Sequence, residues 1–292
     1  MPNPYKTRFA PSPSGPLHLG SLVAALGSYL QAKKQGGQWL VRIEDIDPPR
    51  EMPGASDMIL QSLEDHHLYW DGMVTYQSQH SDYYEQALAG LSAKELCYAC
   101  RCTRAQIKAA GGFYPGTCRD LGLSLSDTSL RFRNVNPVRS FIDERLGLIE
   151  VNPKQADEDF IIKRKDGLYA YHLAVVVDDI RQGITQVVRG ADLLEASVSQ
   201  IALYEALEAT PPSWLHLPIA MAAPGLKLSK QNRAPALEAT LALNNLKKAG
   251  EILGLPNDLQ DVDNIEQFLA LAIRRWRHDL VSERREYQMN QV

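Results

Sequence analysis

The segment from Arg8 to Ser21, RFAPSPSGPLHLGS, limits what this chain can fold into more than any other stretch. It opens with an apolar, strand-like run, and its three prolines exclude a regular helix until His18. From Leu22 to Gln35 apolar residues follow helical spacing, and Gly36-Gly37 stops the pattern. We therefore expect a strand, a proline-stiffened turn and the N-terminus of a helix.

A helix N-terminus after such a turn can bind an anion, because its unpaired N–H groups and the positive end of the helix dipole face the turn. Gly20 would let a phosphate or a flat base approach the backbone closely. The segment alone is equally compatible with a plain connection in which His18 caps a turn.

A second candidate segment is Lys227 to Gln231, KLSKQ, which Pro224-Gly225 and Pro235 flank. Two lysines in a loop suit a polyphosphate whose charge moves during a reaction. By itself this string is typical of a solvated surface loop.

Together, HLGS and KLSKQ resemble the paired signatures of the class I aminoacyl-tRNA synthetases. RIEDIDPPR at 42–50 and VVRGADLL at 187–194 make the chain similar to the glutamyl branch of that family. Ser21 replaces the last histidine of the first signature, as is usual in this branch.

The resemblance implies an α/β fold, with a Rossmann-like parallel sheet, a small zinc-binding insertion and a C-terminal helical domain. The expected ranges are 1–95 and 156–210 for the two halves of the catalytic domain, 96–155 for the insertion, and 211–292 for the lysine loop with a helical, stem-contact-like domain.

Hydrophobic spacing predicts the remaining elements. Strands are expected over Trp39–Ile43, within Asp127–Val151, over Leu173–Val177 and over Ile184–Gly190. Helices are expected over Ala55–Leu68, Ser81–Lys94, from Ala191 through Glu208, over Ala239–Leu253 and over Ile265–Arg285. Asp178 and Asp179 would end the third strand, and His172 before it reads first as a packed core histidine.

Composition narrows the class of protein. A chain of 292 residues can bury a full-sized core. No apolar run is long enough to span a bilayer and the N-terminus lacks a signal-peptide pattern, so we expect a cytoplasmic protein. We also expect a monomer.

The net charge of −4 argues against broad coating of nucleic acid. Local basic clusters, each also readable as a solvated face, occur at Arg101, Arg104 and Lys108, at Lys163–Lys165, and at Arg274, Arg275 and Arg277.

All four cysteines fall between Cys97 and Cys118, which indicates a metal site, because disulfides are rare in the cytoplasm. Zinc takes four ligands, and two sets are possible: Cys97, Cys100, Cys102 and Cys118, or Cys100, Cys102, Tyr114 and Cys118. Spacing favours the first set, since tyrosine is an uncommon ligand. The resemblance favours the second, which we adopt, with one structural Zn²⁺. Unmetallated thiols are the alternative.

The resemblance also implies the residues that bind substrates. Arg8 and Arg189 would contact the carboxylates of glutamate, Tyr171 would shape that pocket, and Ala10, Ser12 and Glu44 would lie at the α-amino end. His18 and Gly20 would hold ATP, and Lys227 and Lys230 would offset charge on its phosphates, which Mg²⁺ bridges. His18 and Lys230 would thus be the catalytic pair.

Too few residues follow Lys230 to build the anticodon-reading domains of a standard glutamyl-tRNA synthetase. The chain thus resembles a short paralogue within this branch. The resemblance implies that it activates L-glutamate with ATP without tRNA, and transfers it to queuosine in the anticodon loop of tRNA(Asp). The alternatives are an enzyme charging a tRNA 3′ end, a nucleotidyltransferase of the pantothenate synthetase type, and a non-catalytic RNA-binding paralogue.

Overall fold

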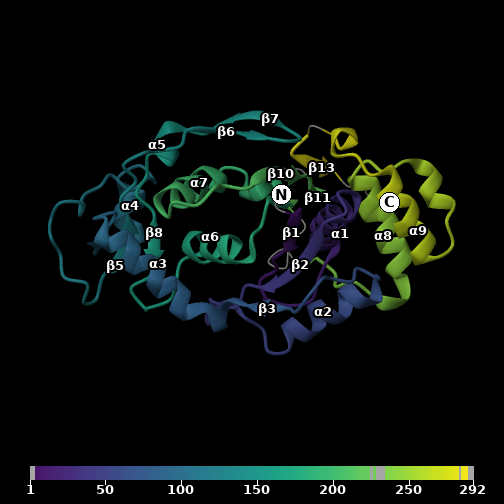
Figure 1. Cartoon of the computed structure of the whole chain (residues 1–292), viewed down its shortest axis with the longest axis horizontal. Coiled ribbons are helices and arrows are strands. Elements are labelled where there is room, and N and C mark those ends of the chain that lie inside the picture. Colours follow the sequence, from purple (N-terminus) through teal and green to yellow (C-terminus); the bar gives the residue numbers. More distant parts are fainter. Residues whose placement is uncertain (1–3, 224–225, 228–233, 283, 289–292) are drawn as a thin grey trace.

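The computed structural model describes residues 4–223, 226–227, 234–282 and 284–288 (Figure 1). The α-helices are α1 (Leu19–Lys34), α2 (Ala55–Asp65), α3 (Ser81–Ala93), α4 (Arg104–Ala109), α5 (Pro153–Ala156), α6 (Tyr171–Gln182), α7 (Ala196–Ala206), α8 (Ala242–Ile252) and α9 (Ile265–Arg275). Single 3₁₀ turns cover Pro48–Arg50, Gln77–His80, Ala191–Leu193, Ala239–Leu241, Asn257–Asp261 and His278–Leu280.

The strands are short and interleave with the helices along most of the chain. They are β1 (Lys6–Phe9), β2 (Gln38–Ile43), β3 (Thr75–Tyr76), β4 (Cys97–Cys100), β5 (Ser129–Phe132), β6 (Ser140–Asp143), β7 (Gly147–Glu150), β8 (Ile161–Lys163), β9 (Gln186–Gly190), β10 (Ser213–Leu217), β11 (Ile219–Ala223), β12 (Leu226–Lys227) and β13 (Glu286–Gln288). The structure confirms the expected strand, turn and helix at the N-terminus.

The central strands pair mostly in parallel. β1 pairs with β2 and β2 with β3, while β9 and β6 both pair with β10, all in parallel. β1 lies beside β9, where the Thr185 N–H donates to the Lys6 carbonyl at 3.0 Å. Because parallel strands present their carboxyl ends at one edge, side chains from β1, β2, β9 and β10 can meet there.

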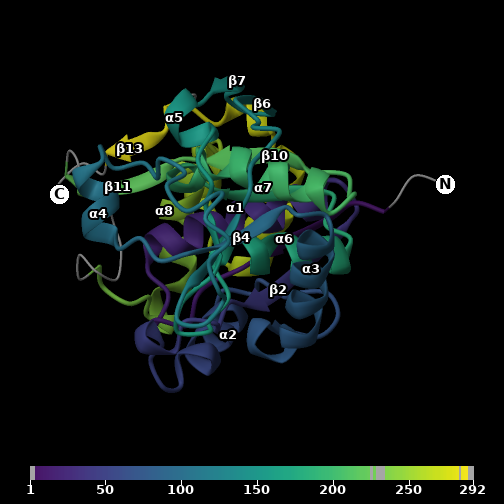
Figure 2. The same cartoon turned by 90° about the vertical axis from the view of Figure 1, so that its left-hand side faces the viewer.

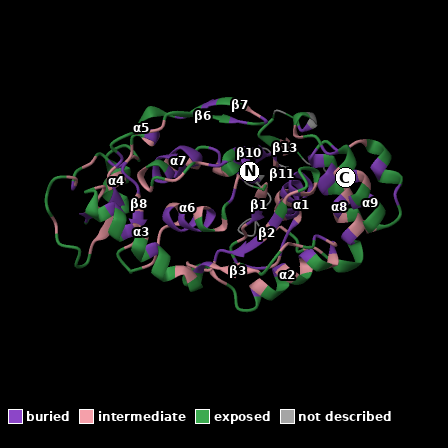
Figure 3. Cartoon of the chain, in the orientation of Figure 1, coloured by how far each residue is buried: buried purple, intermediate pink, exposed green. Residues whose placement is uncertain are grey.

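Helix α1 lies at the centre of the main hydrophobic core and is buried along most of its length (Figure 3). Leu22, Leu26 and Leu30 are fully buried, and each such side chain contributes about 2 kcal/mol to stability. Helices α8 and α9 belong to the same core, through Leu246 and Phe268. At Gly27 an added Cβ would lie 2.5 Å from Leu217 Cδ1, so a larger residue in α1 would require the Leu217 side chain of β10 to move.

The cysteine-bearing segment forms a separate antiparallel sheet, in which β5 pairs with β4 and β8. Figure 1 shows it at the opposite end of the molecule from α8 and α9, and Figure 2 views the molecule from that side. β6 and β7 form a hairpin that does not belong to this sheet. Because β6 pairs with β10, the hairpin extends the sheet of β9 and β10.

The prediction of a strand over Leu173–Val177 is wrong, because these residues lie within helix α6. Seven consecutive residues of this helix, Leu173 to Asp179, are buried, since α3, α7 and β8 pack around it. A helix buried on all sides has no polar face and so shows a continuous apolar run, which sequence cannot distinguish from a buried strand.

The expected helix over Ile265–Arg285 is also too long, since α9 ends at Arg275. Trp276 leaves the helix, is 1% exposed, and donates from its indole Nε1 to Gln31 at 2.7 Å. Because this side chain is held against α1, the chain turns away from the helix axis at Trp276. The Arg277–Asp279 ion pair that follows is exposed. No helix among the described residues is both long and apolar enough to cross a membrane.

Candidate active site and metal centre

The proline-stiffened turn is tied to the segment that follows β2. The Glu44 N–H donates to the Pro11 carbonyl at 3.0 Å, and the Met52 N–H to the Pro13 carbonyl at 2.9 Å. A cavity of about 380 Å³ opens between the two segments and is lined by Ser12, Pro13, Ser14, Glu44, Asp47, Arg50 and Glu51. Ala10, at the end of β1, leads into this turn and is half-buried.

His18 is the N-cap of α1, with its ring Nδ1 accepting from the Ser21 N–H at 3.3 Å, and Gly20 lies in the first turn. The segment after the lysine loop returns to this point, because the Leu237 N–H donates to the Leu17 carbonyl at 2.9 Å. Lys227 ends β12, whereas Lys230 lies outside the described residues.

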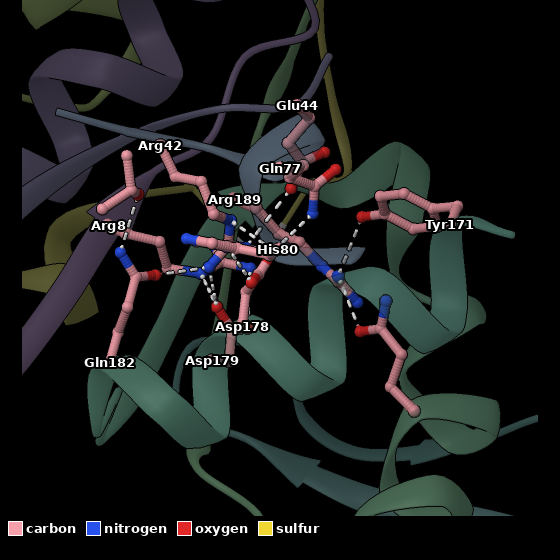
Figure 4. Close-up of polar contacts among 12 residues, drawn as sticks. Arg8, Arg42, Glu44, Gln77, His80, Tyr171, Asp178, Asp179, Gln182 and Arg189 are labelled. Carbon is pink, nitrogen blue, oxygen red and sulfur yellow. Dashed lines mark hydrogen bonds and ion pairs between the residues drawn. The ribbon is translucent and has the colours of Figure 1, made fainter. Parts of the chain in front are cut away.

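Arg8 and Arg42 form one charge cluster with acidic side chains of α6 (Figure 4). Arg8 makes a bidentate pair with Asp179, at 2.9 and 3.1 Å, and Arg42 donates to the same carboxylate at 2.6 Å. Burial would raise the pKa of Asp179, but the two guanidinium groups outweigh it and lower that pKa. The charge of Arg8 is therefore already balanced inside the protein.

Two further carboxylates complete this cluster. Glu44 contacts Arg42 at 3.3 Å, and burial raises the pKa of Glu44 although Arg42 opposes the shift. Asp178 accepts hydrogen bonds from Gln77, His80 and Tyr84, at 2.8, 2.6 and 2.8 Å. The cluster thus joins β1, β2, α3 and α6, and Glu44 connects it to the cavity.

Arg189, near the end of β9, differs from Arg8 and Arg42 in its hydrogen-bond partners. It is 6% exposed, and its hydrogen-bond partners within the described residues are all neutral. They are Gln200 at 2.8 Å, Ser197 at 2.9 Å, the Leu193 carbonyl and His216 Nε2 at 3.1 Å, and the Tyr171 hydroxyl at 3.5 Å. Burial lowers the pKa of Arg189. A buried cation held only by neutral groups is costly unless an anion joins it.

Tyr171 and His172 occupy the first turn of α6, beside Arg189. Burial raises the pKa of Tyr171, and burial together with the charge of Arg189 lowers the pKa of His172 to about 4. The ring of His172 packs against Phe160, with centroids 5.2 Å apart, but the residue as a whole is only half-buried.

The structure brings Arg8, Glu44, Tyr171 and Arg189 into one region, which Figure 4 shows above and beside α6. Sequence reasoning assigned no role there to Arg42, Gln200 or His216, and it placed Asp178 and Asp179 at the end of a strand and not in helix α6. Arg42 was visible as a charge inside an apolar strand, and Asp178-Asp179 as a pair of charges ending an apolar run. Gln200 and His216 gave no comparable local signal, because only the fold brings them to Arg189.

The three cysteines of the metal prediction lie together. The sulfur atoms of Cys100, Cys102 and Cys118 are all within 4.8 Å of one another, and Cys102 and Cys118 are 3.6 Å apart. Tetrahedral zinc with bonds of about 2.3 Å would place its sulfur ligands about 3.8 Å apart. The donor set therefore fits zinc.

Tyr114 belongs to the same small core, and its hydroxyl accepts from the Cys118 N–H at 2.7 Å. The Arg131 guanidinium lies 3.7 Å from the centre of its ring. Cys97 instead packs at the edge of the core around α6, and it is not in the sulfur group found among the described residues.

Comparison with known proteins gives the class of this fold and site. The family described as "tRNA synthetases class I (E and Q), catalytic domain" matches residues 4–112 and 122–245. The chain belongs to this family.

Individual relatives define the branch. The chain is 56% identical to a Vibrio cholerae protein named "Glutamyl-Q tRNA(Asp) synthetase", over 94% of this chain and 91% of the relative. A Shewanella frigidimarina protein with the same name is 50% identical, over 100% and 99% of the two chains. Among solved structures, a glutamate-tRNA synthetase from Elizabethkingia anophelis superposes with a TM-score of 0.83 at 24% identity, covering 99% of this chain and 68% of that one, and supports the fold.

Proposed function

We propose that this enzyme activates L-glutamate with ATP, without tRNA, and transfers the glutamyl group to queuosine in the anticodon loop of tRNA(Asp). The observation that carries the amino-acid assignment is the buried Arg189, whose partners in the described structure are neutral. A substrate with a second carboxylate would balance that charge. The names of the relatives support queuosine-bearing tRNA(Asp) as the acceptor.

In this proposal the two ends of glutamate bind to opposite sides of the pocket. Arg189 and Tyr171 would take the second carboxylate. Arg8, whose Nε and Nη2 already bind Asp179, would contact the ligand through Nη1. Glu44, with Ser12 and Ala10 of the adjoining turn, would receive the α-ammonium group, since Glu44 carries a carboxyl group and lines the cavity.

ATP would bind over the N-terminus of α1, at His18 and Gly20, where the helix dipole favours phosphate. Lys227 and Lys230 would stabilise the charge that develops on the phosphates during adenylate formation. Mg²⁺, coordinated by the phosphates, would supply further charge neutralisation when bound. His18 and Lys230 remain the proposed catalytic residues.

The experiment is glutamate-dependent ATP–pyrophosphate exchange without RNA, followed by transfer of labelled glutamate to tRNA with and without queuosine. We expect exchange without tRNA, and label only on queuosine-containing tRNA. Exchange that requires tRNA, or a periodate-sensitive label at the 3′ end, would replace this proposal with that of a minimal charging enzyme. Absence of any exchange would favour a non-catalytic RNA-binding paralogue.

We further propose that Cys100, Cys102, Tyr114 and Cys118 hold one structural Zn²⁺. Cys100→Ser should lower the zinc content from about one ion per chain towards zero. It should also unfold the insertion, because zinc ligation contributes directly to folding. Cys97→Ser is the matched control and should keep its zinc. Elemental analysis of both proteins decides between the two ligand sets, since zinc loss in the control would assign Cys97 as a ligand.

The remaining proposals concern the state of the protein in the cell. We propose a cytoplasmic monomer with no membrane partner. Sedimentation at several protein concentrations tests the oligomeric state, and a mass that rises with concentration would contradict a monomer.

A further inference from the structure

A fully buried histidine links Arg189 to a carboxylate outside the pocket. His216, in β10, accepts from Arg189 Nε at its own Nε2, at 3.1 Å. Its other ring nitrogen, Nδ1, lies 2.8 Å from Asp143 Oδ2. His216 is 0% exposed and Asp143 1% exposed, so neither group contacts solvent appreciably.

The geometry fixes one tautomer of His216. Nδ1 faces a carboxylate and so carries the proton, which leaves the lone pair of Nε2 for the Arg189 N–H. The Ser197 hydroxyl, 3.3 Å from Nε2, also faces this lone pair. Burial, followed by the charge of Arg189, lowers the pKa of His216 to about 4, although Asp143 opposes the shift.

Asp143 is itself held rigidly at the end of β6. Its Oδ1 accepts from the backbone N–H groups of Arg145 and Leu146, at 3.1 and 2.9 Å. Its Oδ2 accepts from the His216 backbone N–H at 2.9 Å, as well as from the ring. The parallel pairing of β6 with β10 places the two residues together.

We propose that Asp143 and His216 are a positioning pair, which orients the guanidinium of Arg189 for the second carboxylate of the substrate and so favours glutamate over glutamine. The inference rests on the proposed glutamate-activating function. Gln200 and Ser197 hold Arg189 from α7, and His216 holds its Nε from the sheet. Nη2 donates to Leu193 and Ser197, and Nη1 donates to Gln200. With Nε fixed as well, the Nη1 hydrogen that faces the Tyr171 hydroxyl at 3.5 Å is the one directed at the ligand.

Two substitutions of His216 separate the two hydrogen bonds. His216→Gln keeps an acceptor at the position of Nε2, whereas His216→Asn keeps only the link to Asp143. We expect His216→Asn to raise the KM for glutamate about tenfold, in line with the loss of one charge-assisted hydrogen bond, while the KM for ATP stays unchanged. The preference for glutamate over glutamine should fall by a similar factor. His216→Gln should recover part of both losses, because it restores the acceptor for Arg189 but not the hydrogen bond to Asp143.

His66→Asn is the matched control, because His66 is equally buried but lies at the end of α2 and bonds to the Ser62 carbonyl at 2.6 Å. It should leave the KM for glutamate unchanged. A folded His216→Asn protein whose KM for glutamate stays within twofold of the wild type would overturn the proposal. So would an equal rise in both KM values, or a glutamine variant no better than the asparagine one.

A measurement on the wild-type protein covers the case in which the variants do not fold. Nitrogen NMR of protein labelled in histidine should show His216 neutral and protonated at Nδ1 from pH 6 to 8, with its Nε2 signal shifting when glutamate is added. A proton at Nε2 would refute the pair. If exchange is absent in the wild type while the tautomer is as expected, the proposed function fails and the geometry of the pair stands.

Discussion

The two buried arginine sites near α6 differ in how their charge is balanced. Arg8 and Arg42 share Asp179 and lie next to Glu44 and Asp178, so their cations are neutralised by the protein itself. Arg189 is similarly buried, but its described partners are neutral oxygen and nitrogen atoms. Residue type and burial are therefore poor guides to function here. The balance of charge separates Arg42, which holds the acidic cluster together, from Arg189, which is suited to an anionic ligand.

The strongest test of this difference is Arg189→Met. We expect kcat/KM for glutamate to fall about a thousandfold or more, because a pocket built for a charged substrate loses the cation that would balance it. The free energy of unfolding should change by less than about 1 kcal/mol, since the lost hydrogen bonds are offset by removal of an unpaired buried charge. Exchange assays and urea denaturation measure the two quantities. A stability loss as large as the activity loss would make Arg189 a structural residue as well.

Arg42→Met should show the opposite pattern. It leaves Asp179, Glu44 and Asp178 buried with one cation fewer, and such a broken ion pair costs about 3–5 kcal/mol of stability. Urea denaturation without ligands is the measurement. Arg139→Met, which removes the exposed pair with Asp157, is the control and should cause no measurable change. An Arg42 variant as stable as this control would show that the cluster is not structural.

As the pH falls, the stability contributed by His216, beside Arg189, should be lost before that contributed by Asp179 in the cluster with Arg8 and Arg42. His216 has a folded pKa of about 4 and an unfolded value near 6.5, so the unfolded chain binds its proton first as the pH falls. The contribution of neutral His216 to the free energy of unfolding is fully present above pH 6.5 and is lost as the pH falls towards the folded pKa. At pH 5 about 2 kcal/mol of it has been lost. Asp179, whose folded pKa is lowered, loses its contribution only when the pH falls below its ordinary range. Urea denaturation at pH 7 and pH 5 tests this, because His216→Gln should show a smaller decrease than the wild type.

The sequence predicted local features better than distant ones. The strand, turn and helix around HLGS depend on prolines and helical spacing within a few residues, and these elements form as expected. The sulfur group likewise depends on short spacing. The interpretation of Leu173–Val177 failed because a helix packed on every side has the same apolar pattern as a buried strand.

The surroundings of Arg189 could not be read from the sequence for a different reason. Asp143 and His216 are 73 positions apart and meet only because β6 pairs with β10. Spacing and composition carry no information about such a pairing. A single charged residue in a strand, such as Arg42, does give a signal, but whether its partner is a substrate or another side chain depends on the folded structure.

The close approach at Gly27 also bears on how this enzyme can be altered. Any side chain there would press on Leu217, the neighbour of His216 in β10. A larger residue at this position of α1, which makes no polar contact with the pocket, would therefore displace the Leu217 side chain next to His216. Directed evolution of substrate choice should consequently find interdependent changes at these two positions, and position 27 would accept a larger residue only together with a smaller one at 217.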